Sequence, residues 1–336
     1  MLGTPLLFDL KTRGAVLLTG KDRASFLHGL VTNDIRKLTT GTGCAAAFLT
    51  PKGKMLADCV VLCEEERLEI DCEPELGKKI EDLLRKYLVF NDVTIANESA
   101  DTVVFHLTAE EPGSGAEDFL KRGMGFESSL AMPETPHAHR AVVFPFKENP
   151  RAAEGGSVPS LRIVRENRTG VPGWDLRLPS SLSKQIFSSL LSEGARQASA
   201  DEMDVLRIGA GIPRWGFELT EAVLPDEAGL RERGFISESK GCYIGQETVA
   251  RIKTYGHVNR KLVLLSVSGG SPKTGEKIFL EGEESGTVTS ATLAAASGEA
   301  AALAFVKRTH ANPGARFFIR TLAGDLPAVL LPVPLV

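Results

Sequence analysis

The C-terminal part of the sequence carries the pattern that most restricts the fold. From Lys261 onward, short apolar or alternating runs follow one another, separated by glycine, proline and serine, with no helical pattern between them. These runs cover residues 261–267, 277–280, 286–290, 301–306, 316–320 and 328–331. Such runs are typical of antiparallel strands, and six of them can close into a small barrel. We therefore expect a C-terminal antiparallel β-barrel domain over residues 257–336.

The preceding residues, 1–256, mix strand and helix patterns. Residues 15–20, 45–49, 55–63 and 67–72 read as strands, whereas residues 22–31 and 74–88 carry apolar side chains at helical spacing. No Gly-x-Gly-x-x-Gly follows a strand, which argues against a dinucleotide-binding fold and favours an α+β class. A chain of 336 residues exceeds one typical core. We expect residues 1–256 to form two intertwined α+β lobes that divide near residues 97–101. Residues 201–256 are expected to pack back against these lobes.

Composition excludes several classes of function. The net charge of -4 gives no basis for a direct nucleic-acid partner, which normally requires a clustered basic face. No apolar run reaches the roughly 18 residues of a membrane span, so we expect no membrane partner. The cysteines, 5 in number, fall at neither disulfide-framework nor zinc-pair spacing, which favours a reducing cytoplasm and no metal site.

Residues 240–247 read Lys-Gly-Cys-Tyr-Ile-Gly-Gln-Glu and predict a loop that enters a helix. Gly241 and Gly245 would form the structural turns of this loop, because glycine adopts backbone conformations closed to other residues. A thiol near a helix N-terminus and beside a lysine tends towards thiolate, so Cys242 and Lys240 are the predicted catalytic residues. The alternative is a plain turn with Cys242 as a small buried apolar residue.

This string resembles the signature of the YgfZ family of folate-binding proteins, which are relatives of the glycine-cleavage T-protein (aminomethyltransferase). The resemblance implies a T-protein-like multi-domain ring that binds tetrahydrofolate or a derivative, with Tyr243, Gln246 and Glu247 beside the cofactor. Members of the YgfZ family are linked to iron-sulfur cluster assembly or repair and, through cluster enzymes, to tRNA modification. Iron-sulfur cluster proteins are therefore the implied protein partners.

Four further residues are candidates for folate binding. Asn33 and Asp34 close a helix on Thr-Asn-Asp, which resembles the opening pattern of that family; the alternative is a helix C-terminal turn and nothing more. Trp174 could stack on a pterin ring or serve as a packing anchor. Glu227, in Leu-Pro-Asp-Glu-Ala-Gly-Leu, could hold the amino-pyrimidine edge of a pterin, or lie on the surface.

Arg207 and Asp58 complete the predicted cofactor-binding set. Arg207 lies in Leu-Arg-Ile-Gly-Ala-Gly-Ile-Pro, a segment that resembles both families. T-proteins typically carry two adjacent aspartates where this chain has Ala57-Asp58, and a carboxylate there is expected near the reacting folate nitrogen. Three functions stay open: a folate-dependent protein of iron-sulfur cluster assembly, a glycine-cleavage aminomethyltransferase, and a folate-sensing scaffold without chemistry of its own.

Overall fold

The computed structural model describes residues 4–10, 13–109, 116–127, 129–143, 160–293 and 299–333. The chain divides into two compact units. The first comprises Met1–Phe26, Ile35–Cys44 and Cys59–Ala200, and the second comprises Leu27–Asp34, Ala45–Asp58 and Asp201–Val336. Much of the proline- and glycine-rich stretch from 109 to 156 falls outside the described residues.

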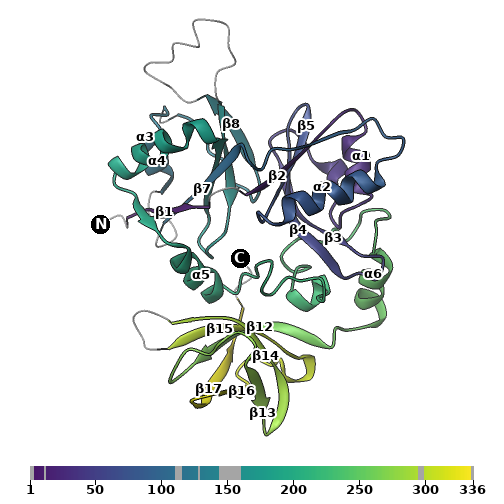
Figure 1. Ribbon diagram of the computed structural model, residues 1–336, viewed down its shortest axis with the longest axis vertical. Coiled ribbons are helices and arrows are strands. Elements are labelled where there is room, and N and C mark those ends of the chain that lie inside the picture. The colour runs from purple at the N-terminus through teal and green to yellow at the C-terminus, as the bar shows by residue number, and fades with distance from the viewer. Residues whose placement is uncertain are drawn as a thin grey trace, which may run out of the picture. The chain divides into compact units, whose positions relative to one another are not determined.

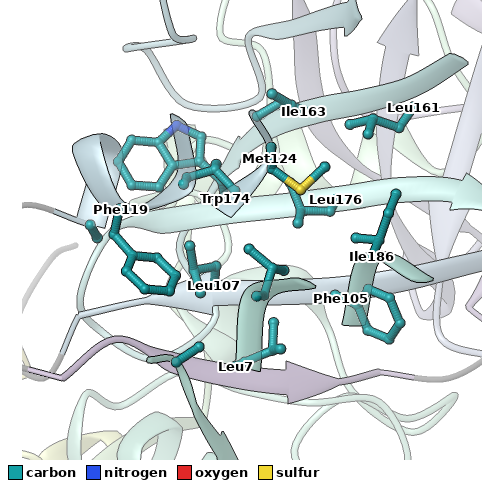
Figure 2. Packing of buried hydrophobic residues seen from close by; sticks show 14 of the residues in the cluster. Leu7, Phe105, Leu107, Phe119, Met124, Leu161, Ile163, Trp174, Leu176 and Ile186 are labelled. Atoms are coloured by element: carbon teal, nitrogen blue, oxygen red, sulfur yellow. The ribbon is translucent and has the colours of Figure 1, made fainter. Parts of the chain in front are cut away.

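The first unit contains a sheet whose strands follow the order β11-β1-β7-β10-β9-β8. β1 and β11 run parallel, and the other neighbours are antiparallel. The strands are β1 (Leu6–Asp9), β7 (Thr102–Thr108), β8 (His139–Val143), β9 (Ser160–Glu166), β10 (Gly173–Pro179) and β11 (Arg196–Ala198). Helices α3 (Ala116–Gly123) and α4 (Ser183–Ser192) cover this sheet (Figure 1). Their apolar side chains form a core with the strands, in which Leu107, Phe119 and Trp174 lie close together (Figure 2).

A second sheet has the order β3-β4-β5-β2-β6. Its strands are β2 (Gly14–Thr19), β3 (Gly43–Leu49), β4 (Met55–Cys63), β5 (Arg67–Cys72) and β6 (Thr94–Asn97). Helix α2 (Leu76–Tyr87) buries Leu76, Ile80 and Leu84, a spacing of four that puts these side chains on one face. The strands predicted at residues 45–49 and 55–63 are the neighbours β3 and β4, and Gly53 in the turn between them has a positive φ of 76°.

The second unit contains a closed barrel of strands in the order β12-β15-β14-β13-β16-β17 (Figure 1). They are β12 (Arg260–Val267), β13 (Lys277–Leu280), β14 (Glu283–Leu293), β15 (Ala300–Lys307), β16 (Arg316–Thr321) and β17 (Gly324–Leu331). Every neighbouring pair is antiparallel. Alternate residues such as Val263, Ala304 and Ile319 fill the interior, as the period-two pattern requires. The predicted barrel is therefore confirmed, with strand bounds close to those expected.

Residues 201–256 belong to the same unit as the barrel, which differs from the expected boundary at 256. They carry the helices α5 (Ala200–Gly209) and α6 (Gln246–Tyr255) and a short 3-10 turn, Pro225–Ala228. Leu219, Val223 and Leu230 pack in one apolar cluster with Phe305 of β15. Because these side chains are buried together, residues 201–256 group with the barrel and the boundary between the units lies after Ala200. The split expected near residues 97–101 falls inside the first unit. Within the described parts of the chain, no helix has the length and apolarity needed to cross a membrane.

Candidate functional site

Lys240 joins the Lys-Gly-Cys-Tyr loop to the segment that follows helix α1 (Arg23–His28). Its ammonium group donates to the backbone carbonyls of His28 at 2.6 Å, Asn33 at 3.0 Å and Val31. It also lies 4.8 Å from the ring centroid of Tyr243. A lysine has three N–H donors, so these carbonyls use its hydrogen-bonding capacity. The geometry assigns Lys240 a positioning role and offers no direct support for the predicted catalytic one.

Asn33 reinforces the same junction. Its side-chain amide donates to the carbonyls of Ala45 at 2.7 Å and Gly234 at 2.8 Å, and its Oδ1 accepts from the backbone N–H of Asp34. The side chain of Asp34 faces His28, with Oδ1 and Nδ1 3.2 Å apart. Thus Asn33 and Asp34, predicted as cofactor ligands, hold their own turn in place.

The two glycines of the loop have different physical roles. Gly245 precedes helix α6 with φ of 85°, and a Cβ there would lie 2.6 Å from the carbonyl oxygen of Thr50. A Cβ on Gly241 would have no neighbour within 4 Å. Gly245 is therefore required by close packing, whereas nothing in its surroundings requires Gly241 to be glycine.

The thiol of Cys242 is exposed, in contrast to the packed alternative left open by the sequence. The loop around it is held by backbone contacts, since the Ile244 N–H donates to the carbonyl of Gly29 at 3.3 Å. Gln246, a predicted cofactor ligand, accepts a hydrogen bond from the Tyr243 N–H at 3.2 Å through its Oε1. An exposed sulfur on a fixed loop is well placed for reaction with a soluble partner.

Tyr243 and Glu247 differ in their environment. Burial raises the pKa of Tyr243 to about 12, so its phenol keeps its proton at neutral pH. Glu247 is exposed in the first turn of α6. A carboxylate at that position stabilises the helix through its dipole.

A pocket of about 710 Å³ lies within the second unit. Its wall includes Lys54 and Glu227, the rings of Phe217 and Phe305, and the cations Arg260 and Lys307. Two of these side chains lie on the outer face of the barrel: Phe305 and Lys307 are two residues apart on β15, while Ala304 and Val306 face the interior. None of residues 240–247 lines this pocket.

Glu227 is the predicted folate ligand that reaches the pocket. Its carboxylate accepts from the Leu224 N–H at 2.9 Å and pairs with Arg260, whose Nε lies 3.2 Å from Oε1. The ammonium of Lys54 is 3.9 Å from Oε2. Arg260 Nη2 also donates to Oε2 at 3.2 Å, so that oxygen accepts two hydrogen bonds and Oε1 keeps acceptor capacity for a ligand.

Arg207 and Trp174 are engaged elsewhere. Arg207 is buried and donates to Glu218 at 3.1 Å and Ser290 at 3.2 Å, so it links α5 to the barrel. Trp174 is 6% exposed within the core of the first unit (Figure 2). Its indole N–H donates to the carbonyl of Pro133. The packing interpretation of Trp174 accounts for these contacts. Asp58 is half-buried on β4 and does not line the pocket.

The sequence reasoning missed the cations and rings of the pocket. Arg260 lies at the start of β12 and Lys307 at the end of β15. The two residues are opposite each other in the register of these antiparallel strands. A basic residue at each strand end was visible in the sequence, but only strand pairing shows that the two share a face.

A cluster of buried charge in the first unit was also missed. Glu69 and Asp71 of β5 lie among the guanidinium groups of Arg13, Arg162 and Arg177. Burial by itself would raise the pKa of Glu69, but Arg177 and Arg162 lower it to about 2. The pKa of Asp71 is likewise held well below its ordinary value, against the effect of burial, by Arg13 and Arg177. These groups neutralise one another, so removal of one partner would leave an uncompensated buried charge. Among the described residues, no three His, Cys, Asp or Glu side chains are grouped to hold a metal ion.

The fold defines a class of protein. The mixed α/β architecture with a closed C-terminal barrel is that of a solved aminomethyltransferase T from the glycine cleavage system of Bartonella henselae. The two structures superpose with a TM-score of 0.78 over 99% of this chain and 87% of the other, at 18% sequence identity.

The chain belongs to the glycine cleavage T-protein family. Residues 4–233 match the GCVT N-terminal domain, and residues 260–336 match the glycine cleavage T-protein C-terminal barrel domain. A chloroplastic protein of Arabidopsis thaliana named as a transferase is 27% identical over 97% of this chain and 70% of its own length. An aminomethyltransferase of Listeria monocytogenes is 27% identical over 98% of this chain and 85% of its own length.

Proposed function

We propose that this chain binds tetrahydrofolate or a derivative in the pocket of its second unit. The observation that carries the proposal is that Glu227 and Phe217 line the same pocket. A carboxylate can accept two hydrogen bonds from the amino-pyrimidine edge of a pterin, and a phenyl ring can stack on its flat face. The ring of Phe217 is 40% exposed, and the guanidinium carbon of Arg214 lies 4.3 Å from its centroid. The pocket volume of about 710 Å³ falls in the range of small-molecule sites.

Titration with tetrahydrofolate under anaerobic conditions tests this proposal. Glu227→Gln and Phe217→Ala should each weaken binding by roughly ten-fold, since each removes one recognition contact. Glu232→Gln is the matched control, because Glu232 is exposed and does not line the pocket. Wild-type protein that binds no reduced folate, or equal affinities in all these variants, would refute the assignment.

The proposed role of the bound folate is in iron-sulfur cluster assembly or repair. Two observations support this role. Cys242 is exposed, and residues 240–247 resemble the YgfZ signature. We expect the protein to act in the cytoplasm on iron-sulfur proteins and to support tRNA modification only through them. Cells that carry only Cys242→Ala should lose activity of iron-sulfur enzymes, although the purified variant folds and binds folate. Unchanged enzyme activity would exclude a reactive role for the thiol.

Aminomethyltransferase activity is the second candidate. The family and several relatives named aminomethyltransferase favour it, whereas the single Asp58 in place of an aspartate pair counts against it. An active transferase must release ammonia and methylene-tetrahydrofolate from an aminomethylated lipoyl carrier and tetrahydrofolate. Absence of both products excludes this activity.

A folate-sensing scaffold is the third candidate, and Cys242→Ser separates it from the first. A scaffold should keep its cellular function when the thiol becomes a hydroxyl of similar size. Loss of function with unchanged folate and partner binding would exclude the scaffold and support thiol chemistry.

A further inference from the structure

The first unit contains a sheet face that carries buried positive charge. Arg162 of β9 and Arg177 of β10 each stand between two residues of the apolar core that this sheet forms with α3 and α4. These core neighbours are Leu161, Ile163, Leu176 and Leu178. Because side chains alternate along a strand, both arginines point to the face opposite that core.

Strand β5 of the second sheet carries the opposite charge. A Cβ on Gly14 would lie 2.4 Å from the sulfur of Cys72 and 3.2 Å from the Cα of Gly77 in α2, so Cys72 faces this helix. By alternation along β5, Glu69 and Asp71 point away from α2. One sheet therefore contributes cations, and the other contributes anions.

The opposite charges meet in pairs that join the two sheets. Arg177 Nε donates to Glu69 at 2.7 Å, and its Nη1 donates to Asp71. Arg162 donates to the second oxygen of Glu69. All four side chains are at most 10% exposed. These pairs form a charged layer between the sheets, in which each group depends on a partner in the other sheet.

Arg168 adds a strap to this charged layer from the connection between β9 and β10. Its Nη2 lies 3.1 Å from Asp71 Oδ2 in the second sheet, and its Nε donates to both oxygens of Asp175 on β10 at 3.0 Å. The connection is held in shape by a bond of 2.7 Å from the Gly170 N–H to Asn167 Oδ1. One guanidinium thus ties a strand of each sheet to a fixed turn.

Each sheet also has an apolar core of its own. Helix α2 buries Leu76, Ile80 and Leu84, and it contacts β2 and β6 of the second sheet. Helices α3 and α4 cover the first sheet. A polar interface between two such bodies favours relative motion. If one charge of the layer is lost, separation of the sheets hydrates the unpaired partner and leaves both apolar cores buried.

We propose that the charged layer is a latch, and that removal of one of its charges lets the two sheets move apart while each keeps its core and its strand pairing. Arg168 is the strap of this latch, because it reaches carboxylates of both sheets from one loop. The latch is a conformational property of the first unit and does not depend on the proposed folate binding.

Hydrogen exchange of the full-length protein, resolved to single amides, tests the latch. The His139 N–H of β8 donates at 2.8 Å to the carbonyl of Gly41, whose own N–H donates to Cys63 of β4. This bond crosses from one sheet to the other and reports opening. Arg168→Gln should speed its exchange by roughly a hundred-fold, since a buried carboxylate loses its partner. Exchange within the β7–β10 and β2–β5 ladders should stay as in wild type.

Arg122→Gln is the matched control, because Arg122 is exposed on α3 and lies outside the charged layer. Its exchange rates should equal those of wild type. An unchanged rate at His139 in Arg168→Gln would overturn the latch and show that the exchange there reports local fraying of β8. Equal acceleration at His139 and in both ladders would also overturn it, because the unit would then open as one body.

Wild-type protein in urea below the unfolding transition gives a measurement that does not rely on a variant. Exchange at His139 should rise with urea, with a slope smaller than that of the two ladders, because opening exposes less surface than unfolding. A zero slope at His139, or a slope equal to that of the ladders, would overturn the inference.

Discussion

Lys240 Nζ donates a hydrogen bond to the backbone carbonyl of Asn33 at 3.0 Å, across 207 residues of sequence. The contact joins the turn after α1 to the loop that carries Cys242. Both segments belong to the same compact unit, and further bonds from the same ammonium to His28 and Val31 strengthen the junction. Buried carbonyls without a donor are costly, so this lysine governs the local order of the loop.

Lys240→Met should lower the free energy of unfolding by about 2–4 kcal/mol, because three carbonyls lose their donor. Urea denaturation measures this change. Lys240→Arg should recover part of the loss, since a guanidinium can still donate to several carbonyls. Lys253→Met, an exposed lysine of α6, should change the stability by less than about 0.5 kcal/mol. Equal effects of the two methionine variants would contradict the positioning role.

Gly245→Ala should be destabilising by about 1–3 kcal/mol, because a side chain at φ of 85° is strained and its Cβ meets the Thr50 carbonyl. Gly241→Ala is its control within the same loop. Alanine there has open space and should be tolerated to within about 0.5 kcal/mol. Thermal and urea unfolding of the two variants distinguish the roles, and a tolerated Gly245→Ala would argue against the observed packing.

Cys242 should be the first cysteine to react with iodoacetamide in the native protein. Its side chain is exposed, whereas Cys59 and Cys72 are 3% and 1% exposed. Mass spectrometry of peptides after brief labelling gives the order of modification. Cys242→Ala should remove the fastest phase of labelling. Modification of Cys59 or Cys72 at the same rate as Cys242 would show that the described burial does not hold in solution.

Lowering the pH should destabilise the protein over the pH range in which Glu69 takes up a proton. The folded-state pKa of about 2 lies below the ordinary value of 4.5, so the folded state binds this proton less tightly than the unfolded state. The contribution of Glu69 to stability is therefore fully present above pH 4.5 and is lost as the pH falls towards 2. Urea unfolding between pH 6 and pH 3 should show falling stability, with a shallower slope in Glu69→Gln. Glu66→Gln, which alters an exposed carboxylate, should retain the wild-type slope. A flat profile would contradict the assignment.

Trp174→Phe should leave the affinity for tetrahydrofolate within about two-fold of wild type, because the indole lies in the core of the first unit. Its free energy of unfolding should fall by about 1–2 kcal/mol, since the smaller ring leaves a void and no N–H for the Pro133 carbonyl. Calorimetric titration and urea unfolding measure the two quantities. A large loss of folate affinity without a loss of stability would instead support the prediction that Trp174 contacts the folate.

Local patterns in the sequence were sufficient to predict the barrel, the strands of residues 45–49 and 55–63 and the loop-to-helix transition at Gly245. These features depend on side-chain periodicity and on backbone conformations that glycine favours, both of which act over a few residues. The exposed position of Cys242 was one of two readings that the sequence allowed, and the tertiary structure selected it.

The partners of individual side chains were decided by tertiary structure alone. Glu227 and Arg207 both looked like cofactor ligands, yet Glu227 lines a pocket while Arg207 is buried against Glu218. Lys307 was not predicted as a site residue from the sequence, yet it lines the same pocket as Glu227. Hydrophobic and polar periodicity specifies which face of an element is buried. It does not specify what that face meets, because contacts between residues far apart in the chain arise only when the elements pack.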